Sequence, residues 1–209
     1  MAITVLPARF QVAASSLASL GVRPYLLTGI FVQMLRQHFA DLQNIVSPSL
    51  SGFTWTSSPD SPVRIESADV WDPDKTDNCP ALIVTRNDWK QERIGIGNRF
   101  LGGDNLDGVE HFSKMMVGSH TITAIDRSGA AAETIAFEAY SELGRFADVI
   151  RRDLCFHRFD FESLGSLKKL KDGRDEFAAP MLVSYAALES WSIRSDAPLL
   201  KTFDFQVQQ

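Results

Sequence analysis

The chain has 209 residues, of which 44% are hydrophobic and 22% are charged. This composition is typical of a folded globular protein and excludes a chain that is disordered throughout. The net charge of −5 is mild and argues against a dedicated nucleic-acid binder, which usually carries a basic excess. No apolar run reaches the roughly 18 residues that a membrane helix needs, and the N-terminus lacks the basic region of a secretion signal. We therefore expect a protein that is made and used in the cytosol.

Residues 1–24 are rich in Ala, Ser and Leu, and Pro7 and Pro24 interrupt them. Nothing in this stretch fixes it to a core, so we expect an N-terminal arm that orders against a partner, followed by one domain over residues 25–209. The two cysteines, Cys79 and Cys155, lack the CxxC spacing of a metal or redox pair. We expect a reducing compartment and two buried thiols that act as small hydrophobic side chains.

A helix of about twenty residues is predicted from Pro24 onward, because apolar residues recur there at spacings of three and four. Pro24 suits the first turn, where a missing N–H costs nothing, and Pro48 ends the element. His38 lies on the apolar stripe, where a satisfied core residue is a better interpretation than a metal ligand. The stripe consists of Leu27, Ile30, Phe31, Met34, Leu35, His38, Leu42 and Ile45.

Short runs of β-branched and aromatic residues, bounded by turn residues, predict strands after this helix. They cover residues 52–56, 63–66, 81–85 and 91–96. A loop rich in Gly and Asp follows at residues 102–108. Residues 111–125 then predict one long strand, in which Gly118 could mark a bulge or a bend.

The second helix is predicted over residues 128–152 as one long amphipathic element. Ser128 is its N-cap, and Arg151 and Arg152 close it at the negative end of the helix dipole. Glu138 and Glu142 are expected on its charged outer side.

Two further strands are predicted at residues 156–161 and after Pro180, separated by a polar connector at residues 165–176. Helices segregated from runs of strands predict an α+β fold rather than an alternating α/β fold.

Three acidic or glycine-rich stretches do not have the spacing of a known ligand site. Residues 95–103 resemble a phosphate loop only faintly, because a dinucleotide fingerprint needs a helix after its glycines and a strand is predicted here. Asp104, Asp107 and Glu110 do not follow the EF-hand pattern, and neither do the aspartates at residues 69–77. We interpret all of them as solvated loops and turns.

The histidines and serines form no catalytic or metal-binding pattern. His111 and His120 lie nine residues apart on one predicted strand and therefore on opposite faces. Cys155 and His157 would share a strand face, but their Phe-rich surroundings disfavour a thiol dyad. No serine lies in a Gly-x-Ser-x-Gly motif. The sequence therefore predicts no catalytic set, no metal site and no cofactor.

Four segments of the chain resemble the tail terminator (tail completion) proteins of tailed bacteriophages. They are residues 128–136, the helix end at 150–153, the strand at 156–159 and residues 180–185. The resemblance lies in the order of elements over about residues 25–195. It implies an α+β fold in which two main helices flank a mostly antiparallel sheet, and a hexameric ring that caps the tail tube at the head–tail joint.

The resemblance also implies the partners of the chain. They are further copies of itself, the tail tube protein and the head–neck connector, with DNA passing through the ring without sequence-specific binding and no membrane involved. Another neck, tube or sheath-associated virion part is the alternative, and a small-molecule-binding or hydrolytic α+β protein is a remote one.

The loops at residues 98–110 and 165–177 are the candidate assembly interfaces, because glycine lets a loop reshape on docking. A solvated surface is the plainer interpretation of the basic connector, since acidic residues dilute its charge. Arg99 and Phe100 could touch nucleic acid or protein, and a protein partner is favoured. The candidate residues are Arg99, Phe100, Leu101, Asp104, Leu106, Lys168, Lys169, Lys171 and Arg174.

Overall fold

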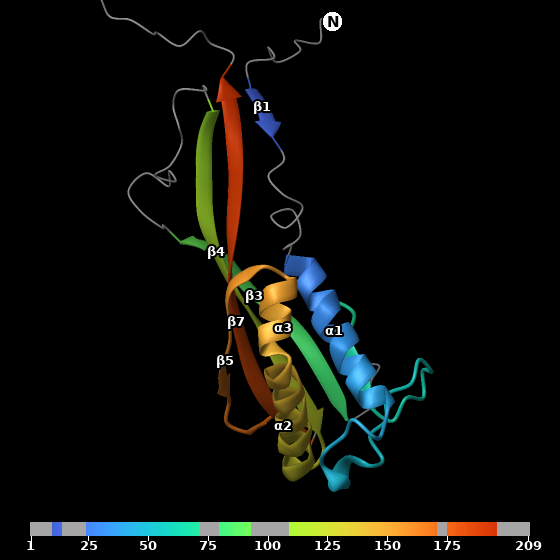
Figure 1. The fold of residues 1–209 in the computed structure, drawn as a ribbon. Coiled ribbons are helices and arrows are strands. Elements are labelled where there is room, and N and C mark those ends of the chain that lie inside the picture. The colour runs from blue at the N-terminus through green and yellow to red at the C-terminus, as the bar shows by residue number, and fades with distance from the viewer. Residues whose placement is uncertain (1–9, 14–23, 72–79, 93–108, 171–174, 196–209) are drawn as a thin grey trace, which may run out of the picture.

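A computed structural model describes residues 10–13, 24–71, 80–92, 109–170 and 175–195. Over these residues the chain forms a seven-stranded sheet with its helices on one face (Figure 1). Among the described strands only β2 and β3 pair in parallel. The predicted α+β class, with two main helices flanking a mostly antiparallel sheet, is confirmed.

Strand β7 is the spine of the sheet. Its first edge pairs with β4, and the order continues through β3 to β2. Its second edge takes three short strands in turn, β6, β5 and β1. The strands are β1 Phe10–Ala13, β2 Arg64–Ser67, β3 Ala81–Glu92, β4 Val109–Asp126, β5 Phe156–Leu164, β6 Lys168–Lys169 and β7 Phe177–Ser195.

Helix α1 spans Pro24–Ala40 and is shorter than its apolar stripe predicts. The chain turns at Asp41, whose side chain accepts from the N–H of Gln43 at 2.9 Å and whose carbonyl accepts from Asn44 at 3.0 Å. Such a local side-chain bond competes with helix continuation. Leu42 therefore lies outside the helix and is 51% exposed. A short 3-10 helix, η1 (Pro48–Leu50), follows.

The predicted long second helix is in fact two helices, α2 (Gly129–Arg145) and α3 (Ala147–Asp153). Ser128 caps α2 as predicted, since its hydroxyl accepts from the N–H of Ala131 at 3.4 Å. The break falls at Phe146, whose backbone leaves the helical region at φ −95° and ψ 5°. Gly144, a weak helix former, lies two residues earlier and favours the break. As a result α3 packs on β5, whereas α2 packs on β4 and β7.

Two strand predictions are wrong. Residues 52–56 form no strand, because the N–H of Trp55 donates to the carbonyl of Phe39 at the end of α1 instead. Strand β7 begins at Phe177, before Pro180 rather than after it. Proline is tolerated there because β5 ends opposite Met181 and β6 begins opposite Ala178, so no strand meets Pro180 from that edge.

The main core lies between the helices and the sheet face they cover. It includes alternate residues of the central strands, such as Ile122 of β4 and Val183 of β7. On the opposite face, four of the described residues form a small buried cluster at one end, which Trp71 and Leu170 border. The largest fully buried side chains are Leu27, Phe31, Leu35, Phe39, Leu50, Ile65, Leu82, Ile122, Ile135, Leu143, Met181 and Tyr185.

Strand β3 has a bulge beside the centre of the sheet. Arg86 pairs with His120 and Trp89 with Gly118, so two residues of β3 lie opposite Ser119 alone. Bulges of this kind re-aim the side chains that follow them. Here the bulge brings both Arg86 and Trp89 to the side of the sheet that the helices cover. The irregularity expected at Gly118 is therefore in the neighbouring strand.

Gly118 lies where two aromatic rings approach the sheet. An added Cβ would lie 2.6 Å from Cε3 of Trp89 and 2.9 Å from Cε2 of Tyr185. We expect Gly118→Ala to lower the free energy of unfolding by about 1–3 kcal/mol, as overpacking usually does. Gly144→Ala is the matched control: a Cβ there meets nothing within 4 Å, so it should raise stability by about 0.5–1 kcal/mol. Urea unfolding of both variants checks this, and a Gly118→Ala protein as stable as the wild type would contradict it.

Strands β4 and β7 continue beyond the body of the molecule as a long ribbon (Figure 1). β3 ends opposite Met115, and β5 begins opposite Ala187. Among the described strands, β4 therefore pairs with β7 alone from Val109 to Lys114. β1, from the predicted arm, adds a third strand at the tip of β7. A ribbon of two or three strands has little stability of its own without a layer on its face.

Candidate assembly surfaces

A buried chain of hydrogen bonds links α1 to the centre of the sheet. His120 and Tyr185 are both 0% exposed. The Tyr185 hydroxyl lies 2.9 Å from Nδ1 of His120, and the Thr28 hydroxyl lies 2.8 Å from Nε2. Since Thr28 donates to the carbonyl of Pro24 at 3.2 Å, it accepts from Nε2, and Nδ1 accepts from Tyr185. A neutral imidazole with its proton on Nε2 satisfies every one of these groups.

Burial keeps both members of this pair neutral. Burial, and second the positive charge of Arg86, lower the pKa of His120 from 6.5 to about 4. Burial also raises the pKa of Tyr185 well above its ordinary value, although Arg86 opposes this rise. The hydrogen bonds of this pair fix α1 on the sheet. Solvent does not reach either side chain, so neither presents a reactive group to a substrate.

A second buried polar cluster ties α1 to α2. His38 is 2% exposed, so its predicted place in the core is confirmed, but only one of its two ring nitrogens is hydrogen-bonded: Nε2 lies 3.1 Å from Oε1 of Glu138. Its Nδ1 lies 3.2 Å from Oε2 of Glu142, but the angles there are too poor for a hydrogen bond. Glu138 is not on the exposed outer side as predicted: it is 4% exposed, because it also accepts from the N–H groups of Val46 and Ser47.

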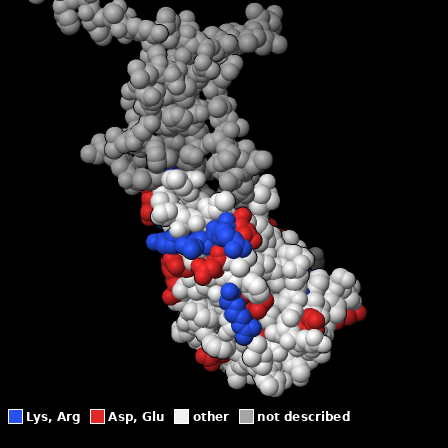
Figure 2. Space-filling view, viewed as in Figure 1, with Lys and Arg blue, Asp and Glu red and all other residues white. Residues whose placement is uncertain are grey.

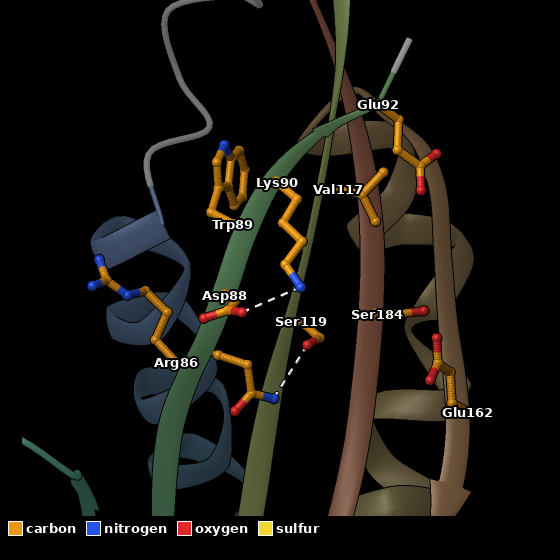
Figure 3. Close-up of a pocket in the computed structure, with 11 residues that line it drawn as sticks. Arg86, Asp88, Trp89, Lys90, Glu92, Val117, Ser119, Glu162 and Ser184 are labelled. Carbon is orange, nitrogen blue, oxygen red and sulfur yellow. Dashed lines mark hydrogen bonds and ion pairs between the residues drawn. The ribbon is translucent and has the colours of Figure 1, made fainter. Parts of the chain in front are cut away.

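The sheet face away from the helices carries an open polar hollow of about 910 Å³ (Figure 3). Asp88 and Lys90 pair there at 3.3 Å, and Glu162 lies on the opposite wall. The Ser184 hydroxyl is buried and has no hydrogen-bond partner. It therefore lacks the adjacent base that would activate it as a nucleophile. The hollow is a solvated sheet face with no arranged catalytic group among its described residues.

Only two of the nine predicted interface residues lie in the described part of the chain. Lys168 and Lys169 form β6, where both are exposed, as a solvated surface requires. Lys169 donates to Asp175 at 2.7 Å, and this hydrogen bond and the ammonium charge lower the pKa of that carboxyl. Lys168 has no ion-pair partner among the described residues. The remaining predictions, Arg99, Phe100, Leu101, Asp104, Leu106, Lys171 and Arg174, lie outside the described residues.

Three large apolar side chains of the helical layer are exposed, one on α2, one at the break after α2 and one on α3. Phe137 is 59% exposed, Phe146 43% and Val149 40%. Arg151 and Arg152 follow on α3, and Figure 2 shows basic side chains over this part of the molecule, interleaved with acidic ones. Exposed apolar residues of this kind are common on folded proteins.

The buried thiol predicted for Cys155 is wrong. Cys155 is exposed, because it occupies the turn between α3 and β5 with a left-handed backbone at φ 55°. That conformation turns the chain from α3 into β5, so that Phe156 enters the core and Cys155 does not. Cys79 lies outside the described residues, as do the predicted loops at 95–103 and 102–108.

In the described part of the chain, no three His, Cys, Asp or Glu side chains are grouped as a metal site requires. No described helix is both long and apolar enough to cross a membrane. Comparison of the chain with protein-family models and with curated proteins gives no match. Function is therefore inferred from the fold and its surfaces.

Proposed function

We propose that the protein is a tail terminator of a tailed bacteriophage. In this role it forms a hexameric ring on the end of the tail tube and joins the tube to the neck connector. The order of its elements supports the proposal: after the short strand β1 come a helix, three strands, a helix interrupted once, and three more strands, of which β5 and β7 are the longer two. Its two main helices flank a mostly antiparallel sheet, which is the fold that the resemblance to terminator proteins implies.

The observation that carries the proposal is the projecting β4–β7 ribbon. A ribbon that leaves the body of the molecule builds no concave pocket of the kind that binds a small substrate. It does present strand edges and faces to other chains, which is how strands join subunits. Among the described residues, one edge of β4 has no partner strand from Val109 to Lys114.

The charge of the chain is compatible with a channel for DNA. A net charge of −5 offers a polyanion no general attraction, so DNA can pass through a ring of such subunits without being held. The protein would then be located in the virion, at the junction of tail and neck.

Tail tubes without their terminator test this proposal. We expect the purified protein to bind one end of each tube as a ring, visible by negative-stain electron microscopy. Lys168→Glu should weaken this binding by about tenfold if β6 faces the tube, because a reversed charge at an interface rim slows association. Lys90→Glu, the same change on the open sheet face, is the matched control.

Binding along the whole tube would overturn the terminator role and favour a sheath-associated part. A protein that incorporates into the tube itself would be a tube subunit. Absence of any binding to tail components would remove the virion proposal altogether.

A further inference from the structure

A groove of about 850 Å³ lies between α1 and the β2 edge of the sheet, and we call it the α1–β2 groove. One wall is α1, from Tyr25 to Arg36. The other wall is the end of β2 with the turn that follows it, residues 66–70. Strand β3 completes the lining with Thr85 and Arg86. A hollow of this size is typical of binding sites.

Arg86 gives the groove an unpaired positive charge. It pairs with His120 across the strands, so its side chain leaves the sheet on the face that α1 covers. Figure 3 shows it extending toward α1, away from Lys90 and Glu162. Arg86 is exposed and forms no ion pair or side-chain hydrogen bond within the described part of the chain. Burial first, and the charge of Arg86 second, lower the pKa of His120, so the guanidinium lies near the contact of that ring with Thr28 of α1.

Arg36 supplies a second guanidinium, which two contacts hold in place. Its Nε donates to the carbonyl of Ile65 at 2.9 Å, and its guanidinium carbon lies 5.2 Å from the ring centroid of Trp55. Its two terminal nitrogen atoms have no hydrogen-bond partner among the described residues. A planar guanidinium that is already fixed in this way loses little freedom when it binds a carboxylate.

The other side chains of the groove limit what it can bind. Glu66 lies 3.9 Å from Arg64, so its charge is compensated within the protein. Asp69 is exposed without an ion-pair partner in the described ranges, so it offsets one of the two guanidiniums. The single positive charge that remains matches a monoanion better than a phosphate dianion. Two exposed side chains add apolar surface, Tyr25 at 59% and Val70 at 69%.

We infer that the α1–β2 groove binds a partner protein through one carboxylate side chain that has an apolar residue beside it. The guanidiniums of Arg36 and Arg86 donate to the carboxylate oxygens, and the apolar residue packs on Tyr25 and Val70. Tyrosine and arginine are the residues that most often dominate such contacts. This inference goes beyond the proposed function, because it assigns a binding site for a second protein and does not depend on the formation of a ring.

Two short peptides test the site on the purified full-length protein. Acetyl-Leu-Glu-Leu-amide carries one carboxylate, and acetyl-Leu-Gln-Leu-amide has the same shape without the charge. We expect the first peptide to shift the backbone NMR signals of Gly29 and Ala68 saturably at pH 7. The second should bind about tenfold more weakly, as the loss of a hydrogen bond to a charged group implies. Equal binding of the two peptides, no saturable shift, shifts elsewhere only, or tighter binding of inorganic phosphate overturns the inference.

Two variants separate the charge from the groove itself. Arg86→Gln removes a guanidinium and should weaken binding of the glutamate peptide about tenfold. Gly29→Leu keeps both guanidiniums but fills the groove and should abolish binding. A Cβ at Gly29 meets nothing within 4 Å, so the fold has room for this side chain.

Lys90→Gln is the matched control, because it removes a cation from the polar hollow on the other face and should leave binding unchanged. Circular dichroism verifies that each variant is folded. Arg86→Gln should also raise the pKa of His120 above its wild-type value, as NMR titration of the imidazole would show. If Arg86→Gln or Gly29→Leu binds the glutamate peptide as tightly as the wild type does, the inference is overturned, whether or not the protein caps tail tubes.

Discussion

Glu138→Ala should lower the free energy of unfolding by about 3–5 kcal/mol, the range typical of removing one partner from a buried polar pair. The Glu138 carboxylate is 4% exposed and lies 3.1 Å from Nε2 of His38. It also accepts from the backbone N–H groups of Val46 at 2.9 Å and Ser47 at 3.2 Å. Loss of the carboxylate leaves three groups without this acceptor: Nε2 of His38 on α1 and the N–H groups of Val46 and Ser47. Each of them lowers the free energy of unfolding if water does not replace the lost bond.

Two further variants separate this effect from a general loss of helix. Glu138→Gln retains one acceptor oxygen and should be intermediate in stability. Glu133→Ala changes an exposed glutamate of the same helix and should stay within about 0.5 kcal/mol of the wild type. Urea unfolding at neutral pH measures all three. If Glu138→Ala were as stable as Glu133→Ala, the buried carboxylate would not join α1 to α2.

Acidification from pH 6.5 to pH 4 should remove about 3 kcal/mol of stability through His120 alone. In the unfolded chain this imidazole has an ordinary pKa of 6.5, whereas in the folded protein its pKa is about 4. Between these values the unfolded state binds a proton that the folded state does not. The contribution of neutral His120 to the free energy of unfolding is therefore fully present above pH 6.5, and it is lost progressively as the pH falls toward 4.

The variant His120→Gln isolates this effect because it has no ring to titrate. It should be less stable than the wild type at pH 7, since the hydrogen bonds to Thr28 and Tyr185 are disturbed. The gap between the two proteins should shrink by about 3 kcal/mol as the pH falls to 4. Chemical unfolding over this pH range measures the gap, and a constant gap would show that His120 is not the buried, neutral group that its surroundings imply.

The helices and long strands of this fold are predictable because their signals are local. Pro24, Ser128 and the apolar residues at helical spacing mark where α1 and α2 begin, and both begin where predicted. Alternating β-branched residues likewise locate β4 and β7, although the ends of the strands differ. The ends depend on distant contacts, such as the bond between Trp55 and Phe39, that no local pattern reveals.

The buried polar groups are less predictable, because their partners are far away in the sequence. The position of Glu138 in the helical repeat is compatible with the outer side of α2. It is buried because the chain at residues 46–47 packs against it and donates two backbone hydrogen bonds to its carboxylate. His120 gives a better signal, since it alternates with the buried Ile122 and Ala124 on β4. Its period of two places it in the core, although its partners Thr28 and Tyr185 cannot be read from the pattern.

Surfaces that would contact other chains are the hardest part to predict. Their exposed apolar residues depart from the usual pattern, in which the outer side of a helix is polar. Phe137 falls on the outer side of an amphipathic helix, where polar residues are the norm. The connector at residues 165–177 is a candidate interface because its glycines let a loop reshape, but in the fold Lys168 and Lys169 form the short strand β6.

The proposed function requires this chain to form a ring on the end of a phage tail tube. The most direct test is the mass of the purified protein in solution by light scattering, with negative-stain images of the same sample and of the protein mixed with tail tubes. We expect rings of six copies, or monomers that become rings only on tube ends. A stable monomer that neither forms rings nor binds tubes would contradict it.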